Sequence, residues 1–345
     1  MRPKKKLQIL DIGWLAVIAL LASQAGATEH AAAAPGHDEI LSPRLSDLEQ
    51  RMFGQIRDGR FGKFSLLEAG LIAGGIDRDD EMRRYCRRFD TLVETLRRSG
   101  NVSGTPRERA QAVFAFLHQS ILRGGYCLQA SDLRQAFDRG RFNCVTASLL
   151  FNCLAERFEL KAVGLEIPGH AMSRLELPGE TLDIETTCPR WSLLGERPGA
   201  ADLRPISEVE LVATIYYNRG VDLLAEKRFA DAAAANAKAV RLDPENATAK
   251  GNFLATINNW AIDLGTSGEY EKAAELLRLG LATDPNYDAF HANYVQLFRQ
   301  WSEHLCRSGH YAAAVRLLTQ AGKEQPDEKF FREAAVEVLR RWAER

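Results

Sequence analysis

The chain has 345 residues, of which 46% are hydrophobic and 26% are charged, and its formal net charge is −1. This composition is typical of globular domains with buried cores, and the length allows about two domains of the usual size. The near-neutral charge argues against a nucleic-acid partner, because proteins that bind nucleic acid normally carry a strong basic bias.

The first 27 residues have the order of a secretory signal peptide. A basic segment, MRPKKK, precedes an apolar run over residues 12–22, and AGA at residues 25–27 has the small residues of a cleavage site. The apolar run is shorter than a membrane-spanning helix, which needs about 20 residues. We therefore expect an exported, periplasmic or otherwise extracytoplasmic protein, with no membrane partner once residues 1–27 are removed and an N-terminal anchor if they are not. Residues 28–44 are expected to form a linker.

Helical patterns dominate residues 45–124. Four segments carry helix start or stop signals: a Ser or Asp cap, terminal glycines, a run from acids to arginines that complements the helix dipole, and a Thr cap followed by Pro. These segments are SDLEQRMFGQI, FSLLEAGLIAGGI, DDEMRRYCRRFDTLVETLRRSG and TPRERAQAVFAFLHQSIL.

The character of the chain changes after residue 140. Gly140 ends one segment, and a further helix is expected to begin near Cys144. After Leu160, the segments KAVGLEIPGHAMSRLEL and GETLDIETT show partial alternation and are bounded by Pro and Gly, which favours strands. Residues 45–200 are therefore expected to form an α+β domain whose N-terminal part is helical.

Residues 205–345 are helical again and contain a repeat. The segments FADAAAANAKAVRLDP, YEKAAELLRLGLATDP and YAAAVRLLTQAGKEQP align without gaps, and their prolines recur every 41 residues. The pattern resembles the tetratricopeptide repeat, whose period is about 34 residues. The extra length equals about two helical turns, so the first helices of the second and third units are expected to be long. An all-α solenoid with a C-terminal capping helix is expected.

A cysteine, a histidine and two acids form a candidate catalytic set. Cys144 stands at the expected helix N-terminus, where free N–H groups and the helix dipole stabilise a thiolate. His170 begins a strand-like run, and Asp183 and Glu185 share one face of the next. A nucleophile, its base and an orienting acid fit this set, although a core cysteine, a strand-edge histidine and surface acids fit the spacing too.

A family resemblance favours the catalytic interpretation. The segment RFNCVTASLLFNCLAERFELKAVGLEIPGHAMSRLEL, followed by LDIETT, resembles the transglutaminase-like superfamily of papain-type folds over about residues 100–192. The resemblance implies Cys144 as the nucleophile and His170 as the base. ETT aligns Glu185 with the family's acid, but that acid is usually Asp followed by Pro-Thr, so Asp183 stays a competing orienting residue. The aromatic residue usual near the histidine is absent.

Two further sets of residues are candidates for binding. The backbone N–H of Cys144 and a second donor would hold an oxyanion, and Asn143 is a candidate for the second donor or else a simple turn residue. In the repeats, the first helices carry Tyr217, Asn258 and Arg299 at the same phase. This set suits contact with a protein or peptide partner in a concave groove, and the alternative is that these helices only face solvent.

The sequence thus predicts an exported cysteine hydrolase, a protease or amidase, or an acyltransferase that acts on peptide or amide bonds. No cofactor and no metal is implied, since the six cysteines lack metal-type CxxC spacing. The alternative is a non-catalytic envelope scaffold that keeps a vestigial triad and binds proteins through its repeats.

Overall fold

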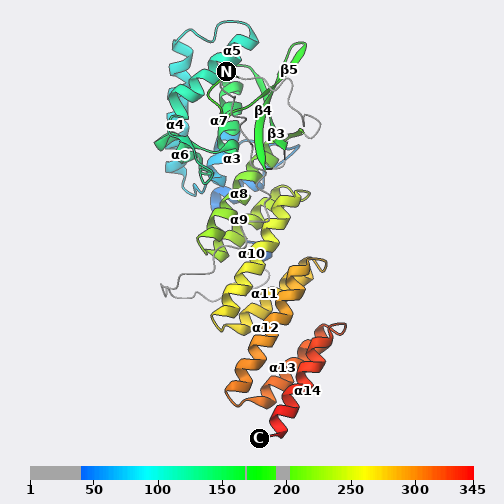
Figure 1. The fold of residues 1–345 in the computed structure, drawn as a ribbon. Helices are drawn as coiled ribbons and strands as arrows, with labels where there is room; N and C mark the ends of the chain where they lie inside the picture. The colour runs from blue at the N-terminus through cyan, green and yellow to red at the C-terminus, as the bar shows by residue number, and fades with distance from the viewer. Residues whose placement is uncertain (1–39, 168, 192–202) are drawn as a thin grey trace, which may run out of the picture. The chain divides into compact units, whose positions relative to one another are not determined.

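The computed structural model describes residues 40–167, 169–191 and 203–345. The expected signal peptide and most of the expected linker lie outside these residues. Helices make up most of the described chain, which also holds a four-stranded antiparallel sheet and a two-stranded parallel sheet, so the α+β class is confirmed (Figure 1). Among the described residues, no helix has both the length and the apolar character that crossing a membrane requires.

The four helices predicted before residue 124 are all present. They are α2 (Asp47–Phe53), α3 (Leu66–Ala73), α4 (Asp79–Arg98) and α5 (Pro106–Phe116), and α5 runs on into the π-helical turn η2 (Leu117–Ile121). Ser46, Ser65 and Thr105 each form a capping box with the glutamate three residues later. Such caps stabilise a helix by about 1 kcal/mol each. A fifth short helix, α6 (Leu133–Arg139), was not predicted.

The four-stranded sheet contains the predicted strands and one more. Its strands are β3 (Lys161–Ile167), β4 (His170–Leu177), β5 (Glu180–Ile184) and β6 (Arg204–Ile206), in the antiparallel order β5-β4-β3-β6. The strand β6 lies beyond residue 200, where the α+β domain was expected to end. Helix α7 (Cys144–Arg157) packs against β3 and β4, and its residues from Cys144 to Ala155 are all buried.

The C-terminal part consists of successive helices in pairs (Figure 1). They are α8 (Glu208–Ala225), α9 (Phe229–Leu242), α10 (Ala247–Thr266), α11 (Tyr270–Thr283), α12 (Asp288–Arg307), α13 (Tyr311–Glu324) and α14 (Lys329–Ala343). The aromatic residues that open the three aligned segments are the first residues of α9, α11 and α13. Helices α10 and α12 each have 20 residues against 18 for α8, as the 41-residue period predicted.

One stacked aromatic pair recurs in each repeat. The rings of Phe229 and Trp260, Tyr270 and Trp301, and Tyr311 and Trp342 lie nearly parallel, with centroids 6.4, 5.8 and 6.5 Å apart. The repeated stack therefore fixes the same helix–helix contact three times along the chain.

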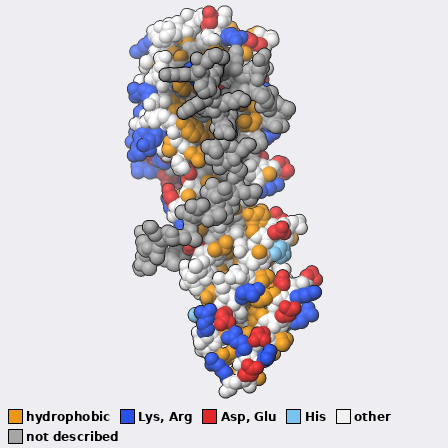
Figure 2. Space-filling view, viewed as in Figure 1, with side chains coloured by type: hydrophobic (Ala, Val, Ile, Leu, Met, Phe, Trp, Pro, Cys, Tyr) orange, Lys and Arg blue, Asp and Glu red, His pale blue; other side chains and the backbone are white. Residues whose placement is uncertain are grey.

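The surface over the last helices carries acidic and basic side chains interspersed with apolar ones (Figure 2).

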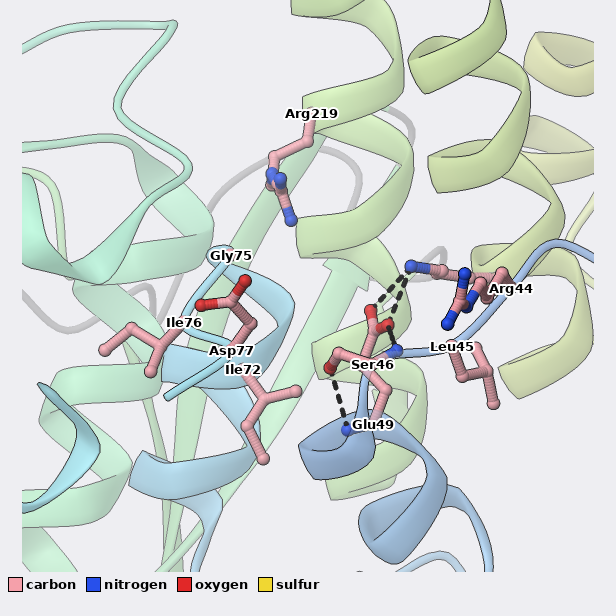
Figure 3. Close-up of a pocket in the computed structure, with 10 residues that line it drawn as sticks. Arg44, Leu45, Ser46, Glu49, Ile72, Gly75, Ile76, Asp77 and Arg219 are labelled. Atoms are coloured by element: carbon pink, nitrogen blue, oxygen red, sulfur yellow. Dashed lines mark hydrogen bonds and ion pairs between the residues drawn. The ribbon is translucent and has the colours of Figure 1, made fainter. Parts of the chain in front are cut away.

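A buried ion pair joins the N-terminal helices to the first repeat. Lys238 of α9 donates to both carboxylate oxygens of Glu49 in α2 at 2.8 Å, and Tyr216 of α8 donates to the same carboxylate at 3.0 Å. Glu49 and Lys238 border a pocket that Arg44, Asp77 and Arg219 also line (Figure 3). The pocket residues include none of the predicted catalytic set.

Candidate active site

Cys144 is the first residue of α7, and local hydrogen bonds set its position. Asn143 caps the helix, because its Oδ1 accepts the N–H of Thr146 at 3.0 Å while its own N–H donates to the Thr146 hydroxyl at 2.9 Å. The Cys144 side chain thus sits at the positive end of a buried helix, and the residue is only 8% exposed. The backbone N–H groups of Val145 and Ala171 lie near its sulfur and help to lower the pKa of the thiol.

His170 reaches Cys144 because the strand that begins with it packs on α7. A tight turn through Gly169 pairs His170 with Ile167 across β3 and β4. The imidazole Nε2 lies 2.9 Å from Oε2 of Glu185. The other ring nitrogen, Nδ1, is therefore the one available to the thiol, which lies within hydrogen-bonding reach of the ring.

Glu185, and not Asp183, is the acid at the imidazole. Glu185 follows directly after β5 and is 7% exposed, and its Oε1 accepts the N–H and the hydroxyl of Thr187 at 3.0 and 2.6 Å. Asp183 instead receives both a 2.5 Å and a 2.8 Å hydrogen bond from Arg174, its direct partner on β4. Two acids on one face thus meet two different cations, and only the acid past the end of the strand reaches His170.

The charges of the three groups support one another. Burial by itself would raise the pKa of the Cys144 thiol, but the hydrogen bond and positive charge of His170, with the two backbone N–H groups, hold that pKa below its ordinary value. Burial would lower the pKa of His170, yet Cys144 and Glu185 together raise it to about 10. The pKa of Glu185, which burial would raise, falls to about 2 because of His170 and Thr187. All three shifts favour the charged forms, so the site stabilises a thiolate–imidazolium–carboxylate row.

Buried hydroxyl groups tie the segment after β5 to α7. The hydroxyls of Ser148 in α7 and Thr186 lie 2.8 Å apart, and the Ser173 hydroxyl of β4 donates to the Ser148 carbonyl at 3.4 Å. These contacts fix Glu185 relative to Cys144 through the segment that follows it.

The prediction that the Asn143 side chain serves as an oxyanion donor is wrong. Its Nδ2 donates to the carbonyl of Leu128 at 3.2 Å and to the hydroxyl of Ser131 at 3.0 Å, and the residue is 1% exposed. With Oδ1 committed to the helix cap as well, the amide has no group left for a substrate.

The predicted binding set in the repeats is also wrong, because two of its three members are buried. Tyr217 and Asn258 are 9% and 8% exposed, and Asn258 Oδ1 accepts a 2.8 Å hydrogen bond from Asn293 in the next repeat. Arg299 is exposed, with its guanidinium 4.4 Å from the ring centre of Phe330. The shared phase reflects packing between helices and not one exposed surface.

Tyr126 is a site residue that the sequence patterns did not indicate. It belongs to β1 (Gly125–Tyr126), which pairs in parallel with β2 (Arg141–Phe142), the strand that leads into Cys144. Its phenol lies near the Cys144 sulfur, and partial burial with the nearby negative charges raises its pKa to about 12. The single aromatic lies 18 residues before Cys144, outside every motif, so only the strand pairing reveals it.

The other cysteines and the charged groups do not build a second centre in the described chain. All six thiols are free of disulfide bonds. Burial raises the pKa of Cys86 to about 11 and that of Cys153 well above its ordinary value, opposite to the direction at Cys144. The described residues contain no cluster of three His, Cys, Asp or Glu side chains placed to hold a metal ion.

The chain matches no protein-family model and no curated protein. Among solved structures, it is similar to the crystal structure of menin that is described as revealing the binding site for the Mixed Lineage Leukemia (MLL) protein. The similarity covers 83% of this chain and 69% of the menin chain, with 11% sequence identity and a TM-score of 0.43. A likeness at this level supports no conclusion about the function of this protein.

Proposed function

We propose that this protein is an exported cysteine hydrolase or acyltransferase of the transglutaminase-like, papain-type kind, acting on peptide or amide bonds. The observation that carries the proposal is the row of Cys144, His170 and Glu185, in which a thiol at a helix N-terminus meets an imidazole that a buried carboxylate holds at 2.9 Å. A structural cysteine in a core needs none of these partners.

The row is suited to acyl transfer in two steps. The Cys144 thiolate attacks the carbonyl carbon of the amide, and the carbonyl oxygen becomes an oxyanion. The His170 imidazolium gives its proton to the departing amine, so the C–N bond breaks and a thioester remains. Neutral His170 then removes a proton from the acceptor, which attacks the thioester and releases Cys144. Water as acceptor gives hydrolysis, and an amine gives transfer. Glu185 stabilises the imidazolium and fixes its orientation throughout.

The helical repeats have a separate proposed role. Their helix pairs, with the 41-residue period and a stacked aromatic pair in each unit, support a tetratricopeptide-like solenoid that contacts a protein or peptide. The contact surface must involve exposed residues other than Tyr217 and Asn258, which are buried.

The pH dependence of iodoacetamide labelling, mapped to each cysteine by mass spectrometry, tests the catalytic proposal. We expect Cys144 to be labelled below about pH 7, faster than the more accessible Cys127 and Cys188, because its thiolate persists there. Replacing His170 by Ala should abolish this advantage. An unreactive Cys144 in the folded wild-type protein would contradict the proposal and favour the scaffold.

The type of reaction is tested with casein and a fluorescent amine. Incorporation of the amine into casein indicates acyl transfer, and new amino termini indicate hydrolysis. Cys144→Ser should remove either activity while leaving the circular dichroism spectrum unchanged. Activity that survives in this variant would show that Cys144 is not the nucleophile.

A further inference from the structure

Tyr126 is held beside the site by backbone hydrogen bonds on both sides of it. The N–H of Gly124 donates to the carbonyl of Gly140 at 2.8 Å, and the N–H of Cys127 donates to the carbonyl of Phe142 at 2.7 Å. The two strands approach so closely at Gly140 that a Cβ there would lie 2.4 Å from the nitrogen of Gly124. Glycine at this position therefore permits the pairing that brings Tyr126 next to the strand before Cys144.

Packing also fixes the direction of the ring. The ring of Tyr126 meets that of Phe142 edge to face, with centroids 6.1 Å apart and an interplanar angle of 88°. The residue is nevertheless 52% exposed, whereas Cys144 is 8% exposed. Tyr126 is thus a neighbour of the buried sulfur that is itself open to solvent.

The chemistry of the phenol suits a donor role. Its hydroxyl lies near the sulfur, which carries the negative charge of the row, and a phenol O–H is able to donate its proton toward that charge. Its raised pKa keeps it protonated at neutral pH, where the lowered pKa of Cys144 favours the thiolate. With the Asn143 side chain committed to other bonds, the site still needs a donor beside the backbone N–H of Cys144.

We propose that Tyr126 is a catalytic residue whose O–H donates to the Cys144 sulfur in the resting site and to the oxyanion of the tetrahedral intermediate. This inference rests on the proposed function. In the adduct, the sulfur and the oxyanion are bonded to the same carbon, so a hydroxyl that reaches one reaches the other after a small rotation of the ring. The N–H of Cys144, which has no partner within the helix, is the second donor.

The proposal distinguishes two reactions of the same thiolate. Acylation by p-nitrophenyl acetate passes through an oxyanion, whereas alkylation by iodoacetamide displaces iodide and forms none. Tyr126→Phe keeps the ring and removes only the hydroxyl. We expect the acylation rate of Cys144 to fall about 100-fold, the loss typical of one oxyanion donor. Alkylation, compared at the plateau of each pH profile, should change by no more than about threefold, since one pKa unit alters thiolate nucleophilicity by about that factor.

The experiment follows the p-nitrophenolate burst and the acetyl group on Cys144 by mass spectrometry in the full chain. Tyr287→Phe, in the repeats, is the matched control and should behave as wild type. Equal acylation in wild type and Tyr126→Phe overturns the inference and leaves the proposed function standing. A parallel loss of acylation and alkylation also overturns it, because the hydroxyl would then act on the thiolate alone. Wild-type protein that is not acylated at Cys144, or whose burst survives Cys144→Ala, overturns the proposed function and this inference with it.

Discussion

Replacing Glu185 by Gln should shift the pH at which Cys144 becomes reactive. The variant keeps the shape of the side chain but removes a charge that lies 2.9 Å from Nε2 of His170. The Glu185 side chain alone is 10% exposed, so solvent screens this charge weakly. A hydrogen bond to a charged group contributes about 1.5–3 kcal/mol, and one pKa unit corresponds to about 1.4 kcal/mol. The pKa of His170 should therefore fall from about 10 by about 1–2 units. Because the imidazolium stabilises the thiolate, the pKa of Cys144 should rise by a similar amount.

The assay is the rate of iodoacetamide labelling at Cys144 between about pH 4 and 9. We expect the midpoint of the rise in rate to lie about 1–2 pH units higher in Glu185→Gln than in wild type. Asp183→Asn is the matched control, since it removes an equal charge two residues away that is paired with Arg174. It should leave the midpoint unchanged. An unshifted midpoint in Glu185→Gln, or an equal shift in Asp183→Asn, would refute the assignment of Glu185 as the orienting acid.

Two predictions concern the free energy of unfolding, which is measured by urea denaturation. Gly220→Ala should cost about 1–3 kcal/mol, because the new Cβ would lie 2.3 Å from Oδ1 of Asn236, whereas Gly251→Ala, which meets open space, should gain about 0.5–1 kcal/mol. Equal effects of the two substitutions would contradict the close approach of α8 and α9. Lys238→Met should cost about 3–5 kcal/mol, since it leaves the 6%-exposed Glu49 without its cation. Adding Glu49→Gln to Lys238→Met should restore much of the lost stability. If Lys238→Met alone left the stability unchanged, the ion pair would not stabilise the fold.

The helices were predictable because their start signals are local. Ser46, Ser65 and Thr105 each cap a helix through atoms within three residues, and Gly74 follows the last residue of α3. The positions of Cys144 and His170 were predictable for the same reason. A cysteine at a helix start and a histidine that follows Pro-Gly in the sequence are also local features, and the packing of β4 on α7 then brings them together.

The choice between the two acids was not predictable from the sequence. Asp183 and Glu185 have the same parity, so strand geometry alone gives both the same face. The pairing register places Arg174 opposite Asp183, and the two side chains form an ion pair. The register depends on the turn between β4 and β5 and on the packing of both strands, neither of which any short segment encodes.

Tyr126 was missed for a related reason. Strands of two residues have no periodicity, and β1 exists only because Gly124 and Cys127 bond the chain next to Cys144. In the repeats, the common phase of Tyr217 and Asn258 was predicted correctly, but phase does not say which neighbour covers a face. Asn258 bonds Asn293, 35 residues later, so the polar side chain that suggested a surface instead joins two helices.

The junction between the site and the repeats makes them one structure. The strand β6 pairs with the free edge of β3, and Ile206 lies over Gly164 so closely that a Cβ there would be 2.8 Å from its side chain. Helix α8 follows at once and shares its core with α7 and α3. A chain cut near residue 205 would leave an unpaired edge on β3, the direct neighbour of β4, which begins with His170. The first repeat helix therefore belongs to the structure that positions the imidazole, and the later repeats extend outward from that core.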